Sequence, residues 1–218
     1  MGPRALVRRR SLIAGVAVFA AFPALAAAQG GGFPVDELIR ALRRGGYVIL
    51  MRHASAPAEP PAAADAEPDN TGRERQLDAS GRAATIAMGD ALKTLQIPVG
   101  EVLSSPTYRA LQTVRLAGLT SPMIVPELGD AGQSMQAVPE PQIAWLRAQV
   151  AQRPSPGTDT VIVTQYPNIQ GAFGQAAANL ADGAALVFFP EDQGRSKLLG
   201  RIPIEDWPRL AREAATLY

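Results

Sequence analysis

The sequence Val48–Ala54 reads V-I-L-M-R-H-A and joins a short apolar run to an arginine and the only histidine of the chain. The run Tyr47–Met51 is almost wholly apolar, which is typical of a parallel strand that is buried on both faces. His53 follows this strand directly, with the guanidinium of Arg52 beside it. A lone histidine is more often structural than catalytic, but ligands of open α/β sheets bind outside the carboxyl ends of the strands. The position of Arg52 and His53 therefore indicates a candidate site.

Short apolar strands alternate with amphipathic helices on both sides of this stretch. The pattern predicts helices at 33–44, 80–95, 107–117, 139–152, 168–180 and 204–217, and strands at 47–51, 101–104, 123–125, 160–164, 184–189 and 198–202. This alternation predicts a three-layer α/β/α sandwich with a mainly parallel central sheet. The segment Ala54–Asn70 is rich in alanine, proline and acidic residues, and we expect it to form a mobile surface loop.

A second arginine follows the second predicted strand, in the sequence S-S-P-T-Y-R-A-L-Q-T from Ser104 to Thr113. Arg109 falls in the first turn of the helix predicted there. A cation at a helix N-terminus opposes the helix dipole, whereas an anion is favoured at that end. A bound phosphate would give Arg109 a reason to be there. A surface ion pair is the alternative explanation when this segment is considered alone.

Four motifs together resemble the histidine phosphatase superfamily, also called the phosphoglycerate mutase-like family. They are V-I-L-M-R-H-A (Val48–Ala54), R-Q-L-D-A-S-G-R (Arg75–Arg82), S-S-P-T-Y-R-A-L-Q-T (Ser104–Thr113) and V-I-V-T-Q-Y-P-N-I (Val161–Ile169). The resemblance covers essentially residues 45–207. It implies a phosphoglycerate mutase-like fold and, with the N-terminal segment described below, the exported bacterial branch whose members act as phosphatases.

The resemblance implies a two-step phosphoryl transfer. His53 would be the nucleophile and would form a phosphohistidine, with its second ring nitrogen held by a backbone carbonyl. Arg52 and Arg109 would bind the phosphoryl oxygens. A carboxylic acid would protonate the leaving oxygen and then act as a base on the hydrolytic water.

One residue departs from the family pattern. Family members carry a second histidine where this chain has Gln165, and that histidine donates to the phosphoryl oxygens. Gln165 retains an N–H donor but loses the positive charge and the ring geometry. Removing an oxyanion donor costs about 3–4 kcal/mol, and a glutamine that still donates should cost less. A slowed enzyme is therefore the expectation, and an inactive phosphate-binding protein on the same fold is the alternative.

The motifs do not decide which carboxylate is the general acid or what role Arg75 has. Pro126–Asp130, P-E-L-G-D, resembles the family segment that ends in a glutamate, with Asp130 at that position. Glu127 is the second candidate, and both could equally be solvated loop carboxylates. Arg75 either lines the mouth of the pocket or pairs with Asp78 or Glu74.

The N-terminal segment predicts export. Arg9 and Arg10 precede the apolar run Leu12–Phe22, and Ala26–Ala28 fits a cleavage site before Gln29. The apolar run is shorter than the about 20 residues of a membrane span. We therefore expect a twin-arginine signal peptide at 1–28, a single domain at 29–218, a periplasmic location and no stable membrane insertion after cleavage.

Composition excludes several classes of site. The chain has no cysteine and one histidine, which excludes disulfides and His/Cys metal clusters, so we expect no metal and no cofactor. Residues 1–28 hold four basic and no acidic residues, which leaves 17 basic against 20 acidic in the remainder. A mildly acidic domain without a basic stripe is a poor nucleic-acid binder. The expected partner is a small phosphorylated substrate or phospho-ligand. The sequence does not identify this ligand, and it does not give the oligomeric state of the protein.

Overall fold

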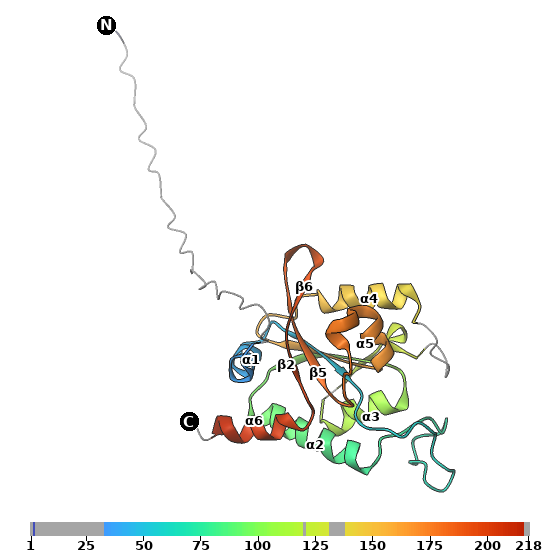
Figure 1. Cartoon of the computed structure of the whole chain (residues 1–218). Helices are drawn as coiled ribbons and strands as arrows, with labels where there is room; N and C mark the ends of the chain where they lie inside the picture. The colour runs from blue at the N-terminus through green and yellow to red at the C-terminus, as the bar shows by residue number, and fades with distance from the viewer. Residues whose placement is uncertain (1, 3–32, 120, 131–137, 216–218) are drawn as a thin grey trace. The chain divides into compact units, whose positions relative to one another are not determined.

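The computed structural model describes residues 2, 33–119, 121–130 and 138–215. Within these residues six strands form one sheet in the order β3-β2-β4-β1-β5-β6 (Figure 1). The strands are β1 (Val48–Arg52), β2 (Val99–Ser104), β3 (Met123–Ile124), β4 (Asp159–Thr164), β5 (Ala185–Pro190) and β6 (Ser196–Ile202). β3, β2, β4 and β1 are parallel, whereas β5 and β6 run antiparallel to their neighbours. The expected mainly parallel sheet is confirmed.

Helices cover both faces of this sheet. They are α1 (Val35–Leu42), α2 (Ala79–Thr94), α3 (Tyr108–Leu116), α4 (Glu140–Val150), α5 (Tyr166–Phe173) and α6 (Asp206–Ala215), with 3-10 turns η1 (Pro126–Leu128), η2 (Gly174–Ala177) and η3 (Asp192–Gly194). In Figure 1, α4 and α5 lie on one side of the strands and α2, α3 and α6 on the other. The three-layer α/β/α sandwich is therefore the observed architecture.

The side chains of β1 show why its sequence is apolar throughout. Ile49 and Met51 pack into a core with α1, α2, α3 and α6, whereas Val48 and Leu50 pack into a second core with α4 and α5. Successive side chains of a strand point to opposite faces. A central strand between two helical layers therefore has no face that meets water, and both faces must be apolar.

The helix after β4 begins earlier and ends earlier than the sequence predicted. α5 starts at Tyr166, and Pro167 in its first turn suits that position because proline fixes φ and needs no donor there. It ends at Gly174, whose φ of 51° lies in the left-handed region that glycine adopts at little cost. The remaining residues to Ala177 form a 3-10 turn.

The segment between β1 and α2 contains no helix or strand, as expected, but several polar contacts fasten it. Asn70 is buried and exchanges hydrogen bonds with the backbone of Glu74. Asp69 accepts from the hydroxyl of Tyr108 and pairs with Arg115, both on α3. These contacts hold the segment against α3 beside the carboxyl end of β1.

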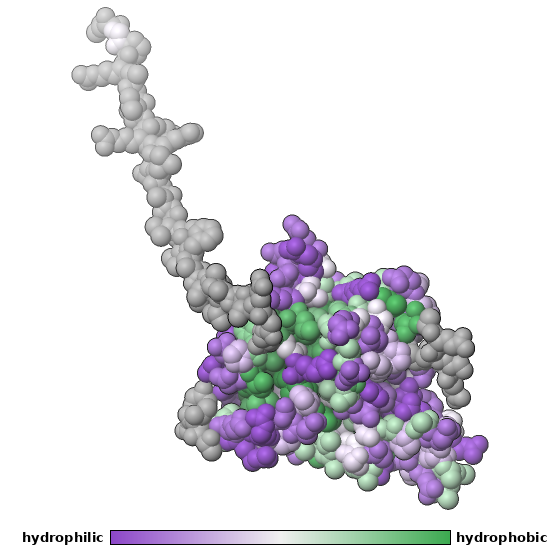
Figure 2. Space-filling model, viewed as in Figure 1, coloured by the Kyte–Doolittle hydropathy of each residue, from purple (hydrophilic) through white to green (hydrophobic). Residues whose placement is uncertain are grey.

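The surface in Figure 2 alternates hydrophilic and hydrophobic areas, and the projecting turn between β5 and β6 is hydrophilic. No helix in the described part of the chain is long and apolar enough to cross a membrane. Gly32–Tyr218 form one compact unit. The predicted signal peptide at 1–28 lies outside the described residues apart from Gly2, and so do residues 131–137 and the last residues of the predicted C-terminal helix.

Candidate active site

Three neighbouring parallel strands deliver one polar residue each to the same edge of the sheet. His53 follows β1, Gln165 follows β4 and Ser105 follows β2. The backbone N–H of His53 donates to Thr164 O at 2.9 Å, which continues the ladder between β1 and β4 by one residue. The N–H of Ser105 likewise donates to Val163 O at 2.9 Å. The sheet thus fixes the spacing of these residues before any side-chain contact is made.

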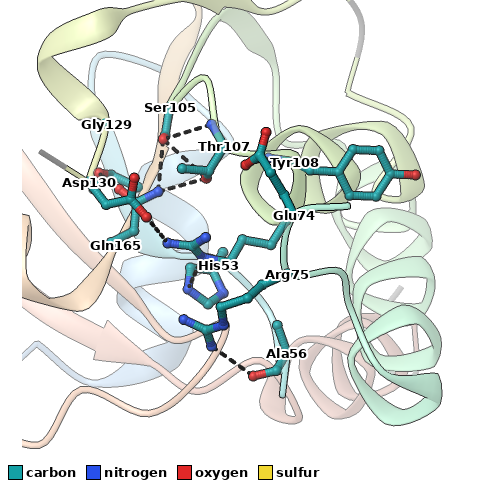
Figure 3. A network of polar contacts seen from close by, with 12 residues as sticks. His53, Ala56, Glu74, Arg75, Ser105, Thr107, Tyr108, Gly129, Asp130 and Gln165 are labelled. Atoms are coloured by element: carbon teal, nitrogen blue, oxygen red, sulfur yellow. Dashed lines mark hydrogen bonds and ion pairs between the residues drawn. The ribbon is translucent and has the colours of Figure 1, made fainter. Parts of the chain in front are cut away.

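A cavity of about 810 Å³ opens at this edge. Its lining residues are Arg52, His53, Ala58, Glu59, Pro60, Glu74, Arg75, Pro106, Thr107, Arg109, Asp130, Gln165, Tyr166 and Pro167. Six of the seven site residues predicted from the sequence are among them. The seventh, Glu127, is exposed on η1 and does not belong to the described lining. Figure 3 shows His53 between the group formed by Ser105, Thr107 and Gln165 and the side chain of Arg75.

The imidazole of His53 is held in one tautomer. Its Nδ1 lies 2.8 Å from Ala54 O, and because a carbonyl oxygen only accepts, Nδ1 carries the proton. Nε2 therefore presents a lone pair, which accepts a hydrogen bond from Arg109 Nε at 3.1 Å. Burial lowers the pKa of His53 from 6.5 to about 3, and the charges of Arg109, Arg52 and Arg75 act in the same direction. His53 is thus neutral, with an unprotonated Nε2 at the cavity.

Arg109 is the most buried of the three arginines at the cavity. Its side chain is 6% exposed, and its Nη2 donates to Asp130 Oδ2 at 2.8 Å. One guanidinium therefore joins the imidazole to a carboxylate. These contacts explain why an arginine is placed in the first turn of α3, and they exclude the surface ion pair as an explanation.

The other two arginines are fixed mainly by backbone carbonyls. Arg52 donates through Nη1 to Leu180 O at 2.9 Å and pairs with Asp182 at 2.5 Å. Arg75 donates to Pro57 O at 2.6 Å and to Ala56 O at 2.9 Å. Arg75 lines the cavity, and its side chain donates to these two carbonyls. Burial, followed by the charge of Arg109, lowers the pKa of Arg75, so the cavity concentrates positive charge.

The structure separates the two candidate acids. Asp130 enters the cavity and contacts Arg109, whereas Glu127 stays on the surface of η1. Two further carboxylates, Glu59 and Glu74, line the cavity and were not proposed as site residues from the sequence. Both come from the loop between β1 and α2, whose alanine, proline and acidic residues gave no signal of which side chains face inward.

Gln165 is 2% exposed and fully engaged by its neighbours. Its amide nitrogen donates to Ser105 Oγ at 2.8 Å and to Thr107 Oγ1 at 2.7 Å. Its amide oxygen accepts from Asn168 Nδ2 at 3.3 Å and lies 3.1 Å from Thr164 Oγ1, whose proton goes to Leu128 O at 2.8 Å. Both N–H groups of the Gln165 side chain, which we expected to donate to a phosphoryl group, therefore donate to hydroxyl oxygens. Ser105, Thr107 and Asn168 are members of this network that sequence reasoning did not single out.

Comparisons with known proteins find solved structures with a similar architecture. The sequence matches no family model, and no curated relative was found. Among solved structures, the protein histidine phosphatase SixA complexed with tungstate is similar with a TM-score of 0.54 and 21% identity, covering 73% of this chain and 98% of that one. A mutant phosphoserine phosphatase from Entamoeba histolytica in complex with phosphoserine has a TM-score of 0.50 and 13% identity, covering 73% and 98%.

These likenesses span nearly the full length of both phosphatases. At such identities they concern the fold, whose sheet places the residues after β1, β2 and β4 around one cavity. The chain therefore has the phosphoglycerate mutase-like fold of the histidine phosphatases, as its motifs predicted.

Proposed function

We propose that this protein is a phosphomonoesterase that works through a phosphohistidine at His53. The observation that carries the proposal is the state of the imidazole: Nδ1 is held by Ala54 O, and the lone pair of Nε2 faces a cavity lined by three guanidiniums. A nucleophile needs an unprotonated nitrogen, and the phosphoryl group needs positive charge around it. The cavity supplies both.

In the first step His53 Nε2 attacks phosphorus, the N–P bond forms and the bond from phosphorus to the ester oxygen breaks. Asp130 supplies the proton that the leaving oxygen takes up. In the second step water attacks phosphorus, Asp130 accepts the water proton and the N–P bond breaks. Inorganic phosphate leaves and His53 is regenerated. The Arg109 guanidinium, which contacts both Nε2 and Asp130, is placed to stabilise the phosphoryl oxygens in both steps.

We further propose that the enzyme acts in the periplasm, after a twin-arginine signal at 1–28 has been removed. The support is the sequence alone: Arg9 and Arg10, the apolar run and the small residues before Gln29. The substrate is then a small phosphate monoester encountered outside the cytoplasm.

The test is phosphate release from a panel of monoesters at pH 5 to 8, by the wild type and by His53→Ala. We expect release by the wild type and none by the variant, because no other described side chain at the cavity is an unprotonated nitrogen nucleophile. Rapid quenching should trap a phosphoenzyme that is stable in alkali and labile in acid. Equal phosphate release by both proteins would overturn the proposal.

A specific observation favours the second candidate, a phosphate-binding protein with little turnover. Both N–H groups of Gln165 are engaged by Ser105 and Thr107, so position 165 supplies no charged donor for the developing oxyanion. The variant Gln165→His separates the two functions. A slowed enzyme should gain about tenfold in turnover from a donor that can carry charge. A binding protein should gain anion affinity and still release no phosphate.

A further inference from the structure

Thr107 stands at the N-cap of α3 but its hydroxyl does not cap the helix. An N-cap threonine ordinarily accepts from a backbone N–H of the first turn. Here no side-chain cap bond forms, and the first N–H of the helix, that of Tyr108, donates instead to Glu74 Oε2 at 3.0 Å. Thr107 is 5% exposed and lines the cavity. Its hydroxyl is therefore released from the usual task of this position.

The orientation of the neighbouring amides can be fixed from carbonyl groups, which only accept. Asn168 Nδ2 lies 2.9 Å from Leu128 O and 3.0 Å from Gly129 O, so this atom is the nitrogen of that amide. The same nitrogen faces Gln165 Oε1 at 3.3 Å. The other side of the Gln165 amide is then its NH₂ group, which faces Ser105 Oγ and Thr107 Oγ1.

Counting lone pairs then fixes the direction of both hydroxyls. Ser105 Oγ accepts from Gln165 Nε2 and from the backbone N–H of Thr107 at 3.2 Å, which fills its two lone pairs. Its proton must point to Thr107 Oγ1, 3.2 Å away. Thr107 Oγ1 thus accepts from both Ser105 and Gln165. Its own proton has no acceptor among the described residues, and the side chain borders the cavity.

We propose that the Thr107 hydroxyl is a catalytic donor that binds an oxygen of the transferring phosphoryl group. The inference deepens the proposed function and rests on it. Gln165 acts through Thr107: its amide and Ser105 occupy both lone pairs of the hydroxyl, so the hydroxyl can only donate. Thr107, His53 and Arg75 line the same cavity, and in the view of Figure 3 the group of Ser105, Thr107 and Gln165 is drawn on the other side of His53 from the side chain of Arg75.

The first test compares Thr107→Val, which removes the hydroxyl at nearly constant shape, with Thr107→Ser, which keeps it. Thr107→Val should lower kcat/KM and the affinity for orthovanadate by about tenfold or more, since a hydrogen bond to a charged group is lost. Thr107→Ser should stay within about threefold of the wild type on the same grounds. Thr94→Val is the matched control, because its hydroxyl donates to Asp90 O on the exposed face of α2.

The second test places Thr107→Val in the Gln165→His background. If Thr107 supplies the donor that position 165 does not, its loss should cost at least threefold less in the double variant than in the wild-type background. Equal losses in both backgrounds would show that Thr107 acts independently of position 165 and would overturn the inference. Circular dichroism and thermal midpoints of each variant identify losses that come from misfolding.

These measurements separate the inference from the proposed function. Turnover by the wild type with unchanged kcat/KM and vanadate affinity in Thr107→Val would overturn the role of Thr107 alone. If the wild type releases no phosphate, the phosphatase proposal fails, and calorimetry with inorganic phosphate then decides: weaker binding by Thr107→Val but not by Thr107→Ser supports the donor, and equal binding overturns it. A wild type that neither binds phosphate nor releases it overturns both.

Discussion

Asp159 gives a prediction whose magnitude follows from the structure. It begins β4 with no exposed surface; its Oδ1 accepts from the N–H of Tyr47 at 2.9 Å, and its Oδ2 has no hydrogen-bond partner in the described part of the chain. Burial raises the pKa of Asp159 from 3.8 to about 7. The folded protein therefore holds this proton more tightly than the unfolded chain. Ionisation of Asp159 destabilises the fold as the pH rises from about 4 to about 7.

The size of this effect follows from the difference between the folded and unfolded pKa values. About three pKa units at about 1.4 kcal/mol each give a loss of about 4 kcal/mol between pH 4 and pH 8. Asp159→Asn removes the titration and keeps an acceptor for Tyr47. Its amide nitrogen lacks a partner, which adds a cost of about 1–3 kcal/mol that does not vary with pH. The informative quantity is thus the change with pH of the stability difference between variant and wild type.

The pH dependence of the wild type's stability does not by itself test the effect of Asp159, because His53 also contributes to it. Its folded pKa lies at about 3, below its usual 6.5, so stability from this group is present above pH 6.5 and is lost as the pH falls toward 3. That slope opposes the slope of Asp159 between about pH 4 and 6.5, and the two nearly cancel. Subtracting the wild type from Asp159→Asn removes the contribution of His53.

The assay is urea unfolding of both proteins at half-unit steps from pH 4 to 8. We expect the stability of Asp159→Asn relative to the wild type to increase by about 4 kcal/mol over this range. Asp90→Asn is the control, because Asp90 is exposed on α2 beside Lys93 and its removal should give no such trend. A stability difference for Asp159→Asn that is constant with pH would refute the reasoning.

Three further predictions concern the site and the N-terminus. The NMR signals of His53, the only histidine in the chain, should not titrate between pH 5 and 8, because burial holds its pKa at about 3; a midpoint near 6.5 would contradict this. Arg109→Ala should weaken phosphate binding by about tenfold or more in calorimetry, since a buried charge-assisted contact is lost, whereas Arg40→Ala, which removes an exposed pair with Asp36, should leave it unchanged. Mass spectrometry of the exported protein should find a mature N-terminus near Gln29, and an intact N-terminus in the membrane fraction would refute the signal peptide.

The fold could be predicted because its evidence is local. The run Tyr47–Met51 is almost wholly apolar, as a strand buried between two helical layers requires, and Val48–Met51 lie in β1. The carboxyl-end rule then placed Arg52, His53 and Gln165 at one edge, as observed. The boundaries of α5 were missed although Pro167 and Gly174 carried the signals that set them.

The remainder of the site depends on contacts between residues far apart in the sequence. Thr107 meets Gln165 across 58 residues, and Arg52 at the end of β1 pairs with Asp182, which lies just before the neighbouring strand β5. Neither pairing has a periodic pattern or a spacing that sequence inspection could detect. The same holds for Glu74, which takes over the capping of α3 from Thr107. The sequence predicted which strand ends carry the chemistry, but the hydrogen-bond partners became visible only in three dimensions.

The charge state of His53 distinguishes the two functions that the cavity could perform. Arg109 and the Thr107 hydroxyl both suit an anion, and either an enzyme or a binding protein would use them. A binding protein gains from a protonated imidazole, because the added positive charge strengthens anion binding. The structure does the opposite: burial and three arginines lower the pKa of His53 to about 3, and Ala54 O keeps the remaining proton on Nδ1. A neutral imidazole contributes little to binding an anion, yet its unprotonated Nε2, which accepts from Arg109 Nε, keeps the lone pair that attack on phosphorus requires. The arrangement therefore favours the phosphatase over the binding protein.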